Sequence, residues 1–294
     1  MGRPGRVSRP ELGAVSTVGE DAEVPLLHAS DLDAISALCA VGMADPPAPD
    51  ELAVALFGIE QPAIVRGDPD LGVVAVVAGD GEAHIRLLVV HPDRRRQGHG
   101  HRLLDAAEAD ALALGHRRLA VGADAPYFLW PGVPTGATGL HCLLERHRYT
   151  RAEANFDMAI RLEALPPEPE GHALATAAQR DEIDTWARSH WPNWRAEILR
   201  ALDKGNLLLA HDDAGVSAFC AFEVNRRGFL GPVAARPDLI GRGAARGVLI
   251  GALHELRRRG RSSVDVVWVG PIVPYARVGG TISNVYFVYR RELS

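Results

Sequence analysis

The fold is decided by one stretch, VVHPDRRRQGHG, which spans residues 89–100. An apolar, strand-like run ends at Pro92, a glycine-containing turn follows, and a helical pattern then places Leu103, Leu104 and Ala107 on one face. The first main-chain N–H groups of a helix have no partner within that helix, so such a turn can bind an anion. The pattern predicts a phosphate or pyrophosphate site in the first half of the chain.

The same pattern returns 145 residues later as AARPDLIGRGAA, residues 234–245. Pro92 and Gly98 correspond to Pro237 and Gly243. Strand-like runs precede both copies and helical runs follow both, and a repeat of this length is too long for a solenoid unit. The chain therefore contains a duplicated domain.

We expect the following organisation from this repeat. Residues 1–22 form a flexible tail, residues 23–164 a first module, residues 165–171 (LPPEPEG) an exposed linker, and residues 172–294 a second module. Antiparallel strands, then one long helix and a parallel strand, recur in each half. The expected fold class is α/β (α+β), with a mixed, mostly antiparallel sheet flanked by helices in each module.

Composition excludes several classes of function. The 294 residues suit two domains of about 150 residues each. A net charge of −5 argues against a nucleic-acid or anionic-membrane partner. Lys204 is the only lysine, which argues against Schiff-base chemistry and against a P-loop nucleotide site. Leu103 stands where a dinucleotide-binding loop needs its third glycine.

The remaining composition predicts a cytoplasmic protein. Cys39, Cys142 and Cys220 are widely spaced and form no zinc or CxxC pattern, as expected for reduced thiols. No apolar run approaches the roughly 18 residues of a membrane span. The first residues lack the apolar region of a secretion signal.

The sequence resembles the GNAT superfamily of acyl-CoA-dependent N-acyltransferases. The loop signature of that family, [RQ]-x-x-G-x-[GA], is matched by RRQGHG at residues 95–100. The second copy keeps Gly243 and the small Ala245 but has Ile240 at the place of Arg or Gln. The resemblance covers nearly the whole chain as two modules in tandem, a layout similar to that of mycothiol synthase and other actinobacterial tandem acetyltransferases.

The resemblance implies acetyl-CoA, or a related acyl-CoA, as co-substrate. Its pantetheine arm would lie against the strand that precedes the loop, and its diphosphate would lie on the loop. In the first module this assigns Leu88, Val89, Val90, Arg95, Arg96, Gln97, Gly98, His99 and Gly100. In the second module it assigns Val233, Ala234, Ala235, Gly241, Arg242, Gly243, Ala244 and Ala245.

The resemblance also implies catalytic residues for attack of an amine on a thioester. The family often places an acidic tyrosine early in its last helix, which assigns Tyr275 in the second module and finds Leu144 in the first. A base near the fourth strand is common, which makes His84 a candidate in the first module and Glu223 an alternative in the second. No metal is expected, because the family loop accounts for the His99-x-His101 pair.

The predicted function is transfer of an acetyl group from acetyl-CoA to a primary amine of a small molecule, with one or both modules active. A non-catalytic acyl-CoA-binding or regulatory protein is the alternative from another class. A protein or peptide amine acetyltransferase is the third. The sequence identifies neither the acceptor amine nor the oligomeric state.

Overall fold

The computed structural model describes residues 23–294 except residues 59, 126, 128 and 130. The predicted tail, residues 1–22, lies outside the described residues. The first half contains, in order, α1 (Leu32–Gly42), α2 (Pro49–Phe57), β1 (Ile64–Asp68), β2 (Gly72–Ala78), β3 (Ala83–Val90), α3 (His99–Ala113), β4 (Arg118–Val121), β5 (Val133–Pro134), α4 (Thr138–Arg146) and β6 (Thr150–Arg161).

The second half repeats this order of elements, except that it begins with the additional strand β7 and that β5 has no counterpart among its described residues. It contains β7 (His172–Leu174), α5 (Arg180–His190), α6 (Arg195–Asp203), β8 (Leu207–Asp212), β9 (Gly215–Phe222), β10 (Leu230–Ala235), α7 (Ala244–Arg258), β11 (Ser263–Val266), α8 (Ile272–Ala276) and β12 (Thr281–Glu292). The long helices α3 and α7 have 15 residues each, and both begin after a glycine. The duplication predicted from the sequence is therefore present in the fold.

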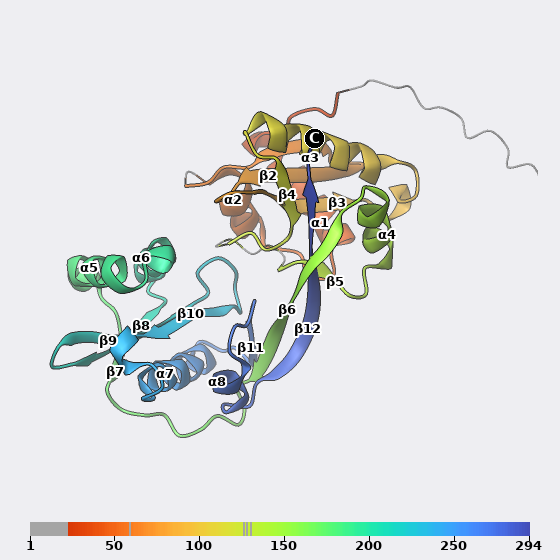
Figure 1. Ribbon diagram of the computed structural model, residues 1–294. Coiled ribbons are helices and arrows are strands. Elements are labelled where there is room, and N and C mark those ends of the chain that lie inside the picture. Colours follow the sequence, from red (N-terminus) through yellow and green to blue (C-terminus); the bar gives the residue numbers. More distant parts are fainter. Residues whose placement is uncertain (1–22, 59, 126, 128, 130) are drawn as a thin grey trace, which may run out of the picture.

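The predicted fold class is confirmed. Neighbouring strands pair antiparallel, apart from the parallel pair of β3 and β4 and one parallel bridge between the β10 and β11 regions. In the first half, one face of the sheet packs on α1 and α2 and the other packs on α3 and α4. In the second half, α5 and α6 cover one face and α7 covers the other (Figure 1).

The two halves exchange their last strands. The C-terminal strand β12 pairs with β4 of the first half, and β6 of the first half pairs with β11 of the second. The long β6 and β12 also pair with each other, and they run side by side from one half to the other (Figure 1). The resulting sheet has the order β1-β2-β3-β4-β12-β6-β11, while β10-β9-β8-β7 form a separate sheet. Each half is thus completed by a strand of the other, and the division of the chain at the linker, residues 165–171, stays a prediction.

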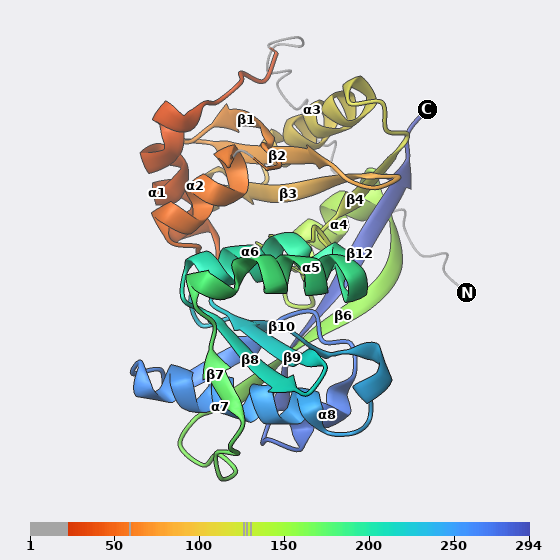
Figure 2. The same cartoon turned by 90° about the vertical axis from the view of Figure 1, so that its left-hand side faces the viewer.

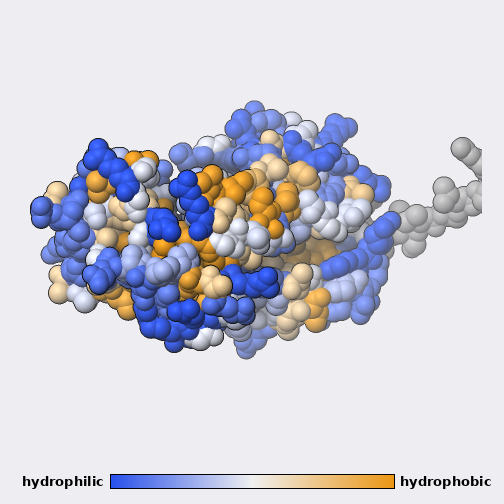
Figure 3. Space-filling model, turned by 90° about the horizontal axis from the view of Figure 1, so that it is seen from below, coloured by the Kyte–Doolittle hydropathy of each residue, from blue (hydrophilic) through white to orange (hydrophobic). Residues whose placement is uncertain are grey.

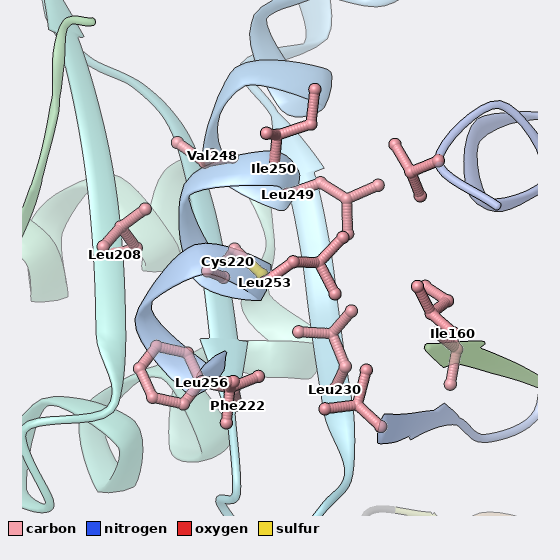
Figure 4. Packing of buried hydrophobic residues seen from close by; sticks show 14 of the residues in the cluster. Ile160, Leu208, Cys220, Phe222, Leu230, Val248, Leu249, Ile250, Leu253 and Leu256 are labelled. Carbon is pink, nitrogen blue, oxygen red and sulfur yellow. The ribbon is translucent and has the colours of Figure 1, made fainter. Parts of the chain in front are cut away.

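The cores under α3 and α7 contain side chains from both halves, whereas among the described residues the cores under α1 and α2 and under α5 and α6 contain side chains of one half each. Met158 and Ile160 of β6 belong to the core under α7, and Figure 4 shows Ile160 in the same cluster as Leu230. In return, Tyr289 and Leu293, near the C-terminus, belong to the core under α3. Because burial of apolar surface is the main stabilising contribution to folding, the cores under α3 and α7 each depend on the strand that they receive.

The face of α5 and α6 lies next to the first half (Figure 2). Arg200 on α6 forms an ion pair with Glu60, and Arg227 contacts Asp50 at 2.7 Å. The Arg227 and Asp50 side chains are more than half exposed, and exposed ion pairs contribute about 0–1 kcal/mol each. The exchanged strands are therefore the main connection between the halves.

All three cysteines have free thiols, with Cys39 and Cys220 buried and Cys142 exposed. Burial raises the pKa of the Cys39 thiol to about 11. No helix among the described residues is both long and apolar enough to cross a membrane.

The strand exchange predicts that two substitutions in β12 differ in how much they lower the free energy of unfolding. Tyr289 is 1% exposed in the first-half core, and its hydroxyl lies 2.8 Å from Nδ1 of His141. We expect Tyr289→Ala to lower the free energy of unfolding in urea by about 3–5 kcal/mol, the usual cost of removing a buried aromatic side chain. Ile282→Ala, in the same strand but 51% exposed, should change it by less than about 0.5 kcal/mol. Equal effects of the two substitutions would contradict the exchange.

Candidate active site

Each half contains a fork, where two neighbouring strands separate in front of a long helix. We call the opening between β3 and β4 the first fork and the opening between β10 and β11 the second fork. Among the described residues, β3 pairs with β4 only where Ala83–Ile85 face Leu119–Val121. Beyond Arg86, residues 87–90 of β3 pair with β2 alone. In the second half, β10 pairs with β9, and a single bridge joins Phe229 to Asp265. Both forks leave one strand edge free to hydrogen-bond an extended ligand.

A β-bulge lies at the mouth of each fork. The pairing register shifts at Arg86 in β3, and it shifts at Gly231 and Pro232 in β10. Arg86 and Gly231 are 145 residues apart and therefore occupy the same place in the repeat. Bulges turn side chains and backbone groups away from the regular ladder and are frequent beside active sites.

The loop that follows each fork strand has the same backbone conformation in both copies. Gly98 caps α3 with a φ of 89°, and Gly243 caps α7 with a φ of 92°. Two residues earlier, Arg96 and Gly241 also have positive φ, at 65° and 80°. Glycine adopts this conformation readily, whereas arginine is strained in it. The predicted equivalence of the two loops thus extends to individual dihedral angles.

The loops leave room for a ligand at the helix N-termini. A Cβ added to Gly98 or to Gly243 would meet no atom within 4 Å. The open N-termini of α3 and α7 supply N–H donors and the positive ends of two helix dipoles. These features fit the diphosphate of an acyl-CoA, and the free strand edges fit its arm.

The predicted loop side chains do not all point toward such a ligand. Nε and Nη2 of Arg95 donate to the carbonyl oxygens of Val90 (3.2 Å) and Gly42 (3.0 Å), and the Gln97 amide donates to the Asp93 carbonyl (3.0 Å). Arg95 therefore shapes the loop. Ile240, its counterpart in the second loop, is 65% exposed and makes no such bond. Ligand contact by the assigned loop residues remains a prediction.

The side chains at the two forks differ strongly. In the first fork Arg86 is fully buried and forms an ion pair with Asp124, with a second contact of 3.2 Å. Its guanidinium also donates to the Ala55 carbonyl (2.6 Å) and to the side chain of Gln61 (2.7 Å) and lies 4.4 Å from the ring centre of Tyr127. These polar and aromatic groups fill the mouth of the first fork on the side of α2.

The second fork lacks this plug. Gly231 replaces Arg86, and Val269 stands 145 residues after Asp124. A Cβ at Gly231 would meet nothing within 4 Å, so this position carries no side chain and has room for one, whereas its counterpart Arg86 is fully buried. The repeat pairs Arg86 with Gly231 in the sequence, but only the bulge geometry shows that the position lies at the fork.

Tyr275, the predicted acid, lies beside the second fork. It packs against the core formed by α7, β9 and β10, and burial raises the pKa of its hydroxyl to about 12. Its counterpart Leu144 is completely buried in the core of the first half. Two apolar side chains are exposed nearby in the sequence, Ile240 on the loop before α7 and Val273 on α8.

Apolar surface also gathers near the middle of the face that Figure 3 shows, between hydrophilic residues. A surface of this kind suits a ligand that carries an uncharged arm.

The two predicted bases are held by structural contacts. Nδ1 of His84 lies 3.2 Å from the Gly122 carbonyl oxygen, in the part of β3 that still pairs with β4. Glu223 accepts a hydrogen bond from the Gly228 N–H (2.8 Å) and forms an ion pair with Arg261 (2.7 Å). Neither side chain is aimed into a fork by these contacts, and the role of His84 as a base remains a prediction.

One cluster outside the forks has the residue types of a metal site. Asp105, Glu108 and His147 place one ligand atom each within 4.8 Å of one another. His147 also lies 2.6 Å from His101, and Glu108 is neutralised by Arg291 at 2.5 Å. The guanidinium competes with a cation for the same carboxylate. The predicted absence of a metal is not tested by this arrangement.

Comparison with known proteins supports this description. Residues 63–127, which include the first fork and its loop, match the sequence model of the acetyltransferase (GNAT) family. No curated protein matches the chain significantly.

Solved structures with the same fold cover nearly the whole chain. A tandem GNAT protein from the clavulanic acid biosynthesis pathway is 16% identical with a TM-score of 0.67, over 91% of this chain and 97% of that one. A GCN5-related N-acetyltransferase from Sphaerobacter thermophilus is 21% identical with a TM-score of 0.67, over 92% and 94%.

A third structure is a GCN5-related glucosamine N-acetyltransferase region of a fungal multi-domain protein. It is 20% identical with a TM-score of 0.75 over 95% of this chain, which spans only 39% of that protein. Residues 63–127 of the chain therefore match the GNAT acetyltransferase family, and the chain has the fold of a solved tandem GNAT protein.

Proposed function

We propose that the protein transfers an acetyl group from acetyl-CoA to a primary amine of a small molecule, and that the transfer takes place in the second fork. The observation that carries this proposal is the contrast at one position of the repeat. Buried Arg86 stands where the strands of the first fork separate, whereas Gly231 has no side chain at the same place in the second, where an added Cβ would meet nothing within 4 Å. An acceptor amine needs this space next to the thioester.

Both loops support binding of acyl-CoA. Each offers a glycine-capped helix N-terminus and a free strand edge, and most of the recognition would come from backbone groups. The first module would then bind acyl-CoA without transferring its acyl group. A cytoplasmic location remains a prediction that the three free thiols support.

Tyr275 is suited to stabilise the departing sulfur. As the amine nitrogen bonds to the carbonyl carbon, the carbon–sulfur bond breaks and its electron pair leaves with the thiolate. A phenol with a pKa of about 12 stays protonated at pH 7 and can donate a hydrogen bond to that thiolate. Because a thiol has a pKa near 8.5, full proton transfer from Tyr275 is unfavourable, and solvent would supply the final proton.

Support for an amine acceptor comes from the family match and from the neighbour described as a glucosamine N-acetyltransferase region. The panel that tests the reaction therefore contains glucosamine, putrescine, an aminoglycoside and a peptide with a free N-terminus. Release of the CoA thiol is measured with each. Binding of acetyl-CoA without release from any of them would favour a regulatory protein.

Matched substitutions in the two loops assign the reaction to one fork. We expect Gly243→Glu to abolish thiol release, because a carboxylate would face the diphosphate, and Gly98→Glu to leave at least half of it. Native mass spectrometry should show two bound acetyl-CoA molecules in the wild type and one in each variant. Gly98→Ala and Gly243→Ala control for the strain of a side chain at positive φ. Loss of turnover in Gly98→Glu alone would move the reaction to the first fork.

The closed first fork makes a separate prediction about stability. Arg86→Met leaves the Asp124 carboxylate buried without its partner, which costs about 3–5 kcal/mol in unfolding free energy. The double variant Arg86→Met/Asp124→Leu should recover most of this loss. Arg118→Met, which breaks an exposed pair with Glu292, should cost about 1 kcal/mol or less. A cost for Arg86→Met as small as that for Arg118→Met would show that the plug is dispensable.

A further inference from the structure

The second fork borders a face of β6 that carries buried polar side chains. Met158 and Ile160 of β6 point into the core under α7, so Asn155 and Asp157 point to the opposite face, because side chains alternate along a strand. Asp157 is 4% exposed and Asn155 is 8% exposed. Asp157 contacts the segment that follows β11, which is one arm of the second fork, and Gly231 lies in β10, which is the other arm.

The repeat supplies an internal control for Asp157. Met158 pairs with Val266, the last residue of β11, and Tyr289 pairs with Val121, the last residue of β4. Met158 and Tyr289 are therefore equivalent, and the residue before each is Asp157 in one case and Val288 in the other. The same position thus carries a carboxylate at the open fork and a fully buried apolar side chain at the plugged fork.

Asp157 is held in place by elements of the second half. Its Oδ1 accepts a hydrogen bond of 2.9 Å from the N–H of Trp268, in the segment that follows β11. The Tyr286 hydroxyl of β12 also bonds to it. Trp268 has a φ of 48°, and Ala123 has a φ of 56° 145 residues earlier, so the same strained turn follows both forks. A carboxylate oxygen accepts more than one bond, so Asp157 keeps acceptor capacity.

A second observation points to a ligand at this face. Nδ2 of Asn155, two residues from Asp157, is buried and has no hydrogen-bond partner among the described residues. A buried N–H group without a partner costs free energy unless a ligand or water satisfies it. Asn155 and Asp157 together offer one donor and one acceptor beside the fork, which is the complement that a polar amine requires.

We infer that Asp157, a residue of the first half, accepts the proton of the acceptor amine in the second fork. This inference rests on the proposed function. As the nitrogen–carbon bond forms, the nitrogen loses one proton to the carboxylate of Asp157, and the sulfur leaves beside Tyr275. The carboxyl group then returns that proton to water. The active fork is composite, because its base comes from the exchanged strand.

The charged groups around Asp157 tune its protonation. Burial, with a smaller contribution from the charge of Asp265 on β11, raises the pKa of Asp157 to about 6. Tyr286 bonds to it from β12, and Asp45 and Arg226 face the same cluster from the first half and from the β9–β10 loop. Asp157 is therefore mostly ionised at pH 7 and able to accept a proton, and it loses this ability below about pH 6.

The test compares full-length Asp157→Asn with the wild type, using the amine of the panel above with the highest kcat/KM. We expect kcat/KM to fall about 100-fold or more at pH 8, with binding of acetyl-CoA unchanged. The ratio of wild type to variant should shrink as the pH falls through about 6, because the wild-type carboxyl becomes protonated. Taking the ratio cancels the titration of the amine itself.

Two further variants give controls. Asp265→Asn should move the acid limb of the wild-type profile to lower pH without removing it. Glu153→Gln changes an exposed carboxylate of the same strand and should leave kcat/KM within about twofold. If Asp157→Asn keeps wild-type activity and pH dependence, Asp157 is not the base and the proposed function stands. If the wild type releases no thiol with any amine, both proposals fail.

Discussion

Antiparallel pairing between β6 and β12 is the interaction on which the rest of the structure depends. It joins residues 150–159 to residues 281–290 and carries each strand from its own half into the sheet of the other. The cores under α7 and α3 then receive side chains from the distant half, such as Met158 in one direction and Tyr289 in the other. Burial of these side chains couples the folding of the two modules. It also places residues of one module beside the fork of the other.

Duplication followed by divergence is visible at the level of single positions. The backbone of the two forks agrees in the bulge, in the glycine caps and in the strained turn. The side chains do not agree, since Arg86 and Leu144 of the first half correspond to Gly231 and Tyr275 of the second. Backbone recognition of acyl-CoA can survive such changes, while acceptor binding and proton transfer cannot. Under the proposed function, this difference leaves acyl-CoA binding in both modules and acetyl transfer in the second alone.

The sequence predicts the elements well because they depend on local patterns. The glycine loop and the hydrophobic period of α3 lie within short windows, and the 145-residue repeat is seen by comparing two such windows; the structure shows each of them. The strand exchange could not be predicted, because β6 and β12 have suitable patterns for pairing within either half. The buried contacts of Arg86 could not be predicted either, because Asp124 and Gln61 are distant from it in the sequence and contact it only in the folded chain. Glu223 has the right chemistry for a base, but its partner Arg261 is not evident from spacing.

The central claim is that an acceptor amine binds in the second fork only, beside a residue that the first half contributes. A crystal structure with an acetyl-CoA thioether analogue and glucosamine would test it most directly. The account predicts the analogue on both glycine loops and the amine nitrogen near Asp157 on the open side of Gly231. An amine bound beside Arg86 in the first fork, with the second fork empty of acceptor, would contradict it.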